Sequence, residues 1–260
     1  MKKLFILGLL GAMPLAFGQV LYDNGPMSTG NTHSTGGVAP AGTTWSEIQR
    51  NASGTNSVLG FSVNYTNGGA IGPNHQADDF TVGAGGWSVT GFNVYGFRSN
   101  GGTSEQYTSG VLRIWNGVPG APGSSIIAGD LTTNILQSTT FSNMYRTGRG
   151  SASTIRPIME VSLKFASPVL LSQGTYWMDY GLTSGGTTFA PLVTRPGEIE
   201  PAGANGMFFT SGQWFTMVDS NSGAKMEVPF QVIGAPVPEP ATLAALGLGL
   251  LAVRRRRKKA

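Results

Sequence analysis

Apolar residues recur at every second position in several segments of this chain, and no long helical period occurs between residues 19 and 236. In residues 159–165, Met, Val, Leu and Phe alternate with Glu, Ser and Lys. Residues 176–180 place Tyr, Met and Tyr on one side of such a repeat. Because successive side chains of a β-strand point to opposite faces, this pattern predicts strands with one buried face.

Glycine and proline separate these segments. Asn-Gly, Pro-Gly and Gly-Gly pairs supply positive φ angles or preset turns between them. Many short strands joined by such turns predict an all-β fold, a single jelly-roll-like β-sandwich over residues 19–235, whose two sheets would bury the aromatic residues. Further predicted strands are 61–65, 87–97, 111–115, 208–218 and 228–233.

Two local features refine this prediction. Gly91 interrupts the strand at 87–97, and the inward set changes there from Trp87 and Val89 to Phe92 and Val94, which indicates a β-bulge. Residues 24–56 are rich in Gly, Ser, Thr and Asn, which favours a loosely structured lead-in with a weak helical signal at 44–50.

The net charge of +4 is misleading, because the cations concentrate at the two ends. Lys2, Lys3 and residues 254–259 supply eight of the seventeen basic residues, and Glu239 is one of the thirteen acids. Residues 19–236 therefore hold nine cations and twelve anions, a net charge of −3. Without a basic stripe the chain is not expected to bind nucleic acid. It has no cysteine, which excludes thiol nucleophiles and Cys-ligated zinc.

The two ends have the pattern of targeting segments. Residues 1–18 combine a basic start, an apolar run at 4–10 and small residues before Gln19, the layout of a cleaved signal peptide. Residues 236–260 form a separate tail with a motif at 237–240, an apolar segment at 241–253 that predicts a short membrane helix, and a basic end at 254–259. Cations beside a bilayer resist translocation, so this end is expected to stay inside. The apolar segment is short against the roughly 20 residues of a spanning helix.

The tail resembles the PEP-CTERM sorting region of exported bacterial proteins. The resemblance rests on the motif and on the basic cluster that follows the apolar segment. It implies membrane tethering, recognition and processing by an exosortase-type enzyme, and delivery to the cell surface or the medium. The motif residues are Val237, Pro238, Glu239 and Pro240, and the membrane-stop cluster is Arg254, Arg255, Arg256, Arg257, Lys258 and Lys259.

The body is similar to a recurrent group of uncharacterised bacterial surface and PEP-CTERM proteins. The matching stretches are 21–26, 77–82, 112–117 and 174–177. This resemblance implies a jelly-roll-type sandwich and gives no activity.

Asp78 and Asp79 form the single adjacent acidic pair of the body and are a candidate Ca²⁺ site, because calcium prefers clustered carboxylate and carbonyl oxygens. Asp130, Asp179 or Asp219 are candidates to join them in space. The competing interpretation is an ordinary strand start, since neighbouring strand residues face opposite sides and no EF-hand spacing is present.

Catalysis receives little support from the sequence. Neither histidine, His33 or His75, lies near a nucleophile motif, and both are expected in exposed loops. Glycoside hydrolysis by a pair of carboxylates remains an open alternative. The candidate acids are Glu47, Glu105, Glu160, Glu198 and Glu200.

Tryptophans are the last candidates, because exposed aromatic rings stack on sugars. Core packing is the default for most of the five, and Trp115 and Trp214 are the two candidates for sugar stacking. We therefore predict an exported, surface-sorted, non-catalytic envelope or matrix protein in an exopolysaccharide or biofilm setting, with no obligatory cofactor. The alternatives are a carbohydrate-binding module, with or without Ca²⁺, and a glycosidase.

Overall fold

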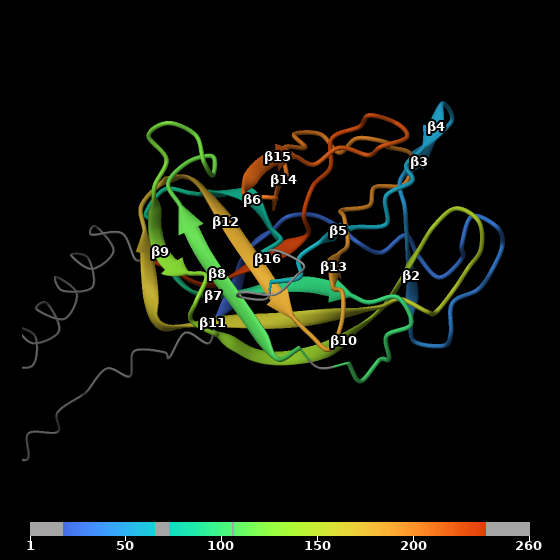
Figure 1. The fold of residues 1–260 in the computed structure, drawn as a ribbon, viewed down its shortest axis with the longest axis horizontal. Helices are drawn as coiled ribbons and strands as arrows, with labels where there is room; N and C mark the ends of the chain where they lie inside the picture. The colour runs from blue at the N-terminus through green and yellow to red at the C-terminus, as the bar shows by residue number, and fades with distance from the viewer. Residues whose placement is uncertain (1–17, 66–72, 106, 238–260) are drawn as a thin grey trace, which may run out of the picture.

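The computed structural model describes residues 18–65, 73–105 and 107–237 (Figure 1). The predicted signal peptide at 1–18, apart from its last residue, and the predicted tail helix at 241–253 lie outside these ranges. The described residues contain no helix that is long and apolar enough to cross a membrane.

The described residues form strands that pair into two large sheets, as the alternating pattern predicts. The first sheet runs in the order β1-β16-β7-β11-β10-β2, with β13 beside β7 and β5 beside β13. These strands are β1 (Gln19–Asp23), β2 (Thr44–Glu47), β5 (Phe61–Ser62), β7 (Trp87–Phe97), β10 (Leu136–Thr147), β11 (Pro157–Leu171), β13 (Phe189–Ala190) and β16 (Phe230–Pro236).

The second sheet has six strands in the order β15-β14-β6-β12-β8-β9, all antiparallel. A separate hairpin pairs β3 with β4. The strands are β3 (Arg50–Asn51), β4 (Gly54–Thr55), β6 (His75–Val82), β8 (Ser109–Trp115), β9 (Ile126–Asp130), β12 (Gly174–Thr183), β14 (Met207–Thr210) and β15 (Gln213–Thr216).

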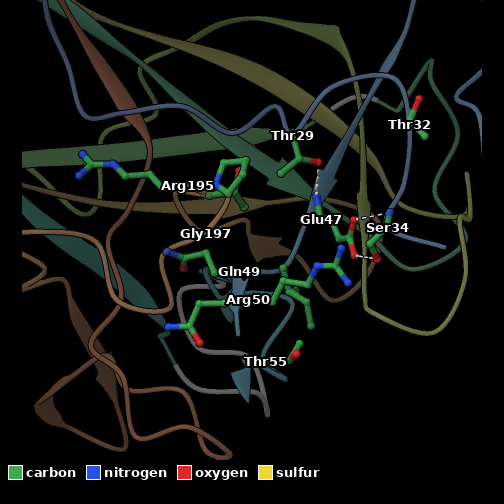
Figure 2. A pocket seen from close by; sticks show the side chains of 13 residues that line it. Thr29, Thr32, Ser34, Glu47, Gln49, Arg50, Thr55, Arg195 and Gly197 are labelled. Carbon is green, nitrogen blue, oxygen red and sulfur yellow. Dashed lines mark hydrogen bonds between the residues drawn. The ribbon is translucent and has the colours of Figure 1, made fainter. Parts of the chain in front are cut away.

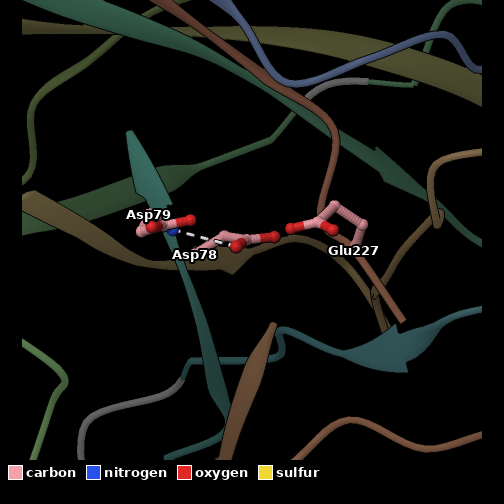
Figure 3. A group of neighbouring side chains, drawn as sticks. All are labelled: Asp78, Asp79 and Glu227. Atoms are coloured by element: carbon pink, nitrogen blue, oxygen red, sulfur yellow. Dashed lines mark hydrogen bonds between the residues drawn. The ribbon is translucent and has the colours of Figure 1, made fainter. Parts of the chain in front are cut away.

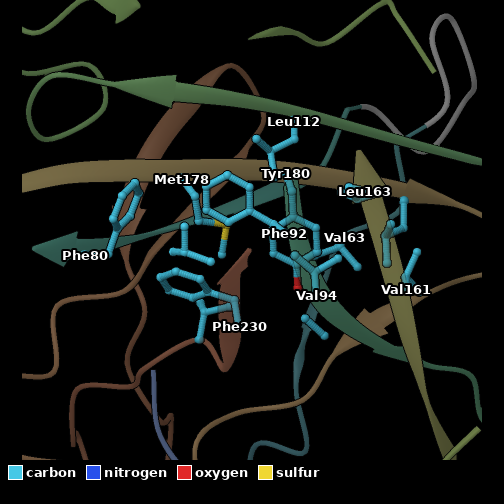
Figure 4. Packing of buried hydrophobic residues seen from close by; sticks show 14 of the residues in the cluster. Val63, Phe80, Phe92, Val94, Leu112, Val161, Leu163, Met178, Tyr180 and Phe230 are labelled. Atoms are coloured by element: carbon cyan, nitrogen blue, oxygen red, sulfur yellow. The ribbon is translucent and has the colours of Figure 1, made fainter. Parts of the chain in front are cut away.

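One hydrophobic core joins the two sheets, which confirms the all-β sandwich (Figure 4). Phe92, Val161 and Phe230 enter it from the first sheet, and Met178 and Tyr180 enter it from the second. The Tyr180 hydroxyl crosses the core and donates a hydrogen bond of 3.3 Å to the carbonyl of Tyr95. Burying this aliphatic and aromatic surface is the main favourable term of the fold.

The predicted bulge at Gly91 is present. In the pairing of β7 with β16, Ile233 lies opposite Gly91 and Gly234 lies opposite Val89, so one residue of β7 is unpaired. A Cβ atom at Gly91 would lie 2.1 Å from the carbonyl oxygen of Leu163. The neighbouring backbone therefore requires glycine at this position.

The lead-in at 24–56 is more regular than the sequence indicates. The weak helical signal at 44–50 was wrong, because residues 44–47 form β2, which pairs in parallel with β10. Trp45 is 2% exposed and packs against Tyr145 and His33. This tertiary burial outweighs the local preference for a helix.

Candidate functional site

The six-stranded sheet carries an aromatic cluster on the side away from the core. Tyr176, Met178 and Tyr180 of β12 belong to the core cluster, so Trp177 and Asp179 between them point to the opposite face. The register brings residues of four further strands to that face. We call this set the aromatic face, and it consists of Trp115, Trp177, Phe209 and Trp214 around His75, Arg113 and Asp179.

Asp179 is the fixed centre of the aromatic face. It is fully buried, and its carboxylate contacts His75 Nδ1 at 2.5 Å. The other carboxylate oxygen accepts hydrogen bonds from Arg113 Nε and, at 3.0 Å, from Trp115 Nε1. Three donors on two neighbouring strands therefore hold one carboxylate. Such a satisfied network fixes the orientation of the Trp115 ring.

Ring contacts extend this network to the edge of the sheet. His75 stacks on Phe209 with 4.3 Å between the ring centroids, and Trp214 meets His75 edge-on at 4.9 Å. At the other end, the Arg113 guanidinium lies 4.8 Å from the Trp115 ring centroid. Trp115 and Trp214, the two predicted stacking residues, are thus linked through His75 and Asp179. Both are partly exposed.

The candidate metal residues Asp78 and Asp79 meet a third acid, Glu227 (Figure 3). One carboxylate oxygen from each lies within 4.8 Å of the others. Asp78 is fully buried and Glu227 is 6% exposed. Burial raises the pKa of Asp78 well above its usual value, and the adjacent Glu227 raises it further. Burial also raises the pKa of Glu227.

Hydrogen bonds already occupy much of this carboxyl cluster. Asp78 Oδ2 accepts from the backbone N–H of Val228 at 2.6 Å and from Asn24 Nδ2 at 3.2 Å. The Glu227 carboxyl group lies beside Asp78 and disfavours the ionisation of Asp78. The arrangement is that of a buried carboxyl pair in which burial favours the protonated form, and its oxygens are also of the type that binds calcium.

The three aspartates considered as further ligands lie elsewhere. Asp130 caps a turn through Thr132 and Thr133, and Asp179 belongs to the aromatic face. Burial opposes the ionisation of Asp219, but backbone N–H donors, Val58 foremost, outweigh it and lower its pKa. Sequence reasoning missed Glu227, because no motif links it to a strand 149 positions earlier.

The expectation that both histidines lie in exposed loops was wrong. His33 and His75 are 2% and 1% exposed. His33 Nε2 lies 3.0 Å from the carbonyl of Gly148, and its Nδ1 accepts from the backbone N–H of Thr35. Ring packing against Trp45 and Phe209 buries the two imidazoles, and only tertiary contacts reveal it.

The candidate glycosidase acids have separate partners. Glu105 binds Arg98 at 2.6 Å, Glu200 accepts from the backbone N–H of Lys225, and Glu47 accepts from Ser34. Glu198 lies 3.9 Å from Arg195 in its own loop. Glu160 on β11 is half-buried, and burial raises its pKa.

Comparison with known protein families identifies a motif in the C-terminal region. Residues 236–258 match the PEP-CTERM protein-sorting motif. The chain carries a PEP-CTERM sorting motif. A protein with this motif is exported, is held at the membrane by the tail, and is sorted to the surface through an exosortase. The motif residues 238–240 and the basic cluster at 254–259 lie outside the described residues.

The match to the sorting motif begins at the last residue of β16. Val237 still donates a backbone hydrogen bond of 3.0 Å to Gly86, so the ordered sheet leads directly into the motif. Comparisons with curated proteins and with solved structures gave no significant match.

Proposed function

We propose that this PEP-CTERM protein is a non-catalytic envelope or matrix component that holds exopolysaccharide on its aromatic face. The observation that carries the proposal is that Trp115 and Trp214 lie on the same face of one sheet. Asp179 holds the Trp115 ring by a hydrogen bond, and His75 packs against the Trp214 ring. Prepositioned aromatic rings with polar neighbours suit the apolar faces and the hydroxyl groups of sugars.

The non-catalytic part of the proposal is supported by the state of the carboxyl groups. The neighbouring carboxyl groups of Asp78 and Glu227 are buried beneath the surface, where a polysaccharide does not reach them. Asp179 is fully buried and held by three donors, which makes it a structural anchor of the face. A reducing-end assay that detected hydrolysis of the host exopolysaccharide, abolished by Glu160→Gln or Glu198→Gln, would overturn this part.

Calorimetric titration of the full chain in detergent with purified host exopolysaccharide tests the binding. We expect heat of binding, and at least about fivefold weaker affinity after Trp214→Ala or Trp115→Ala, because one stacking contact is worth about 1 kcal/mol. Phe215→Ala is the matched control, since Phe215 is an exposed aromatic residue on the same strand outside the aromatic face.

The same titrations in calcium and in EDTA distinguish calcium-independent binding from calcium-dependent binding. Equal binding in both would assign recognition to the aromatic rings alone. Binding restricted to calcium would show that recognition requires a bound cation. A chain that gives no heat with the polysaccharide in either condition would exclude the binding role.

A further inference from the structure

A cavity lies apart from the aromatic face, next to β2 and the β3–β4 hairpin (Figure 2). Its volume is about 490 Å³, within the range of small-molecule sites. Three chain segments form it, and its lining is dominated by hydroxyl, amide and charged side chains. The lining residues used below are Thr29, Ser34, Glu47, Gln49, Arg50 and Arg195.

Hydrogen bonds between the three segments make the cavity rigid. Thr194 donates from its backbone N–H to Pro26 and from its hydroxyl to Met27, at 2.9 and 2.6 Å. Asn56 ties the hairpin to the 194–199 loop through a 2.7 Å bond to the carbonyl of Ile199. A cavity held in this way is preorganised, so a ligand would not have to order its walls.

Glu47 provides an oriented acceptor in the cavity wall. Its carboxylate is held by the backbone N–H of Ser34 at 2.9 Å and by the Ser34 hydroxyl. Each carboxylate oxygen can accept two hydrogen bonds, so Glu47 retains capacity for a ligand hydroxyl. Figure 2 shows the Arg50 side chain extending toward this Ser34–Glu47 pair. Within the described residues, Arg50 has no ion-pair partner.

Gln49 supplies the second, independent observation. It is 4% exposed, and its Nε2 has no hydrogen-bond partner among the described residues. Its Oε1 makes a weak contact of 3.5 Å with Asn56. Gln49 lines the cavity, and a buried amide donor without a partner costs about 1–3 kcal/mol. An acceptor group that reached Nε2 from the cavity would remove this cost.

We propose that this cavity binds one hexose-sized sugar unit. Vicinal hydroxyl groups both donate and accept, which matches a wall containing a carboxylate acceptor, guanidinium and amide donors, and threonine and serine hydroxyls. The cavity lining contains no aromatic ring, so hydrogen bonds rather than stacking would supply recognition. This site is separate from the aromatic face and stands or falls independently of it.

Saturation-transfer NMR on the full chain in detergent, with glucose and glucuronate as probes, tests the proposal. We expect saturation transfer to at least one probe, weakened at least tenfold in affinity by Arg50→Gln. Gln49→Met should keep the fold, because it removes an unpaired donor from a buried site, and should weaken binding at least fivefold. Arg149→Gln is the control, since Arg149 is exposed and does not line the cavity.

The aromatic-face variants separate this site from the proposed function. Trp214→Ala should leave binding of the small probes unchanged. The proposal is overturned if neither probe binds, if Arg149→Gln weakens binding as much as Arg50→Gln does, or if Trp214→Ala abolishes binding while Arg50→Gln does not.

Discussion

The carboxyl groups of Glu227 and Asp78 are neighbours inside the protein, and their acid–base chemistry affects the stability of the fold. Both carboxyl groups have pKa values raised by burial. A carboxyl group with a raised pKa binds more protons in the folded state than in the unfolded state. Its stabilising contribution is therefore complete below the unfolded pKa of about 4 and is lost as the pH rises through the folded pKa.

Glu227→Gln should weaken this pH dependence, because the amide removes the neighbouring charge and can donate to Asp78. We compare the free energy of unfolding of the variant with that of the wild type at each pH. The difference, variant minus wild type, should be about 1 kcal/mol larger at pH 8 than at pH 4. Denaturant unfolding at both pH values measures it. The lowered pKa of Asp219 gives a slope of opposite sign, which is common to both proteins and cancels in the comparison. If the free energies of unfolding of the wild type and the variant changed in parallel with pH, the proposed interaction between the two carboxyl groups would be contradicted.

The bulge in β7 is the element-scale feature that the sequence located most sharply. The change of the inward set across Gly91 was visible in the alternation, and the pairing with β16 shows the unpaired residue there. In the pairing of β11 with β7, the register also shifts between Lys164 and Val169. The bulge lets both ends of β7 contribute to the same core.

Gly91→Ala should destabilise the protein by about 2 kcal/mol or more, because the new Cβ atom would meet the backbone of Leu163, which cannot move aside easily. Thermal unfolding measures the loss. Gly83→Ala is the matched control, since a Cβ atom there has no neighbour within 4 Å. Equal melting temperatures for the two variants would show that the close approach at Gly91 is relieved elsewhere.

At the scale of the whole molecule, the first and last strands of the body are neighbours. Gln19 of β1 pairs with Gly234 of β16, two residues before the sorting-motif match begins. The predicted signal-peptide junction and the sorting motif therefore adjoin the same sheet. The chain therefore enters the region of the sorting-motif match directly from β16.

Joint replacement of Pro238, Glu239 and Pro240 by alanine should leave export intact and block later processing. The expected result is a membrane-bound species of higher mass than the wild-type product, measured by intact-mass analysis of the membrane and medium fractions. Pro119→Ala with Pro122→Ala is the control, because these prolines lie in a loop remote in sequence from the motif. Unchanged product mass in the triple variant would contradict a role of the motif in processing.

Local periodicity and turn chemistry were enough to predict the sandwich and the strand at 159–165, because the alternation and the turn residues each depend only on residues close together in the sequence. They failed at 44–47, where the burial of Trp45 against Tyr145 decides for a strand. They failed for both histidines, whose polar neighbours in sequence gave no sign of the aromatic rings that cover them in space.

The sequence by itself determined the sorting motif, the all-β class and the absence of thiol chemistry, since each depends on residue identity or on spacing within a short window. The tertiary structure alone decided which residues meet. It joined Glu227 to Asp78, Trp214 to Asp179 through His75, and Arg50 to the Glu47 cavity. The physical reason is that strand order and register set these contacts, and they depend on how two whole sheets bury their apolar faces together.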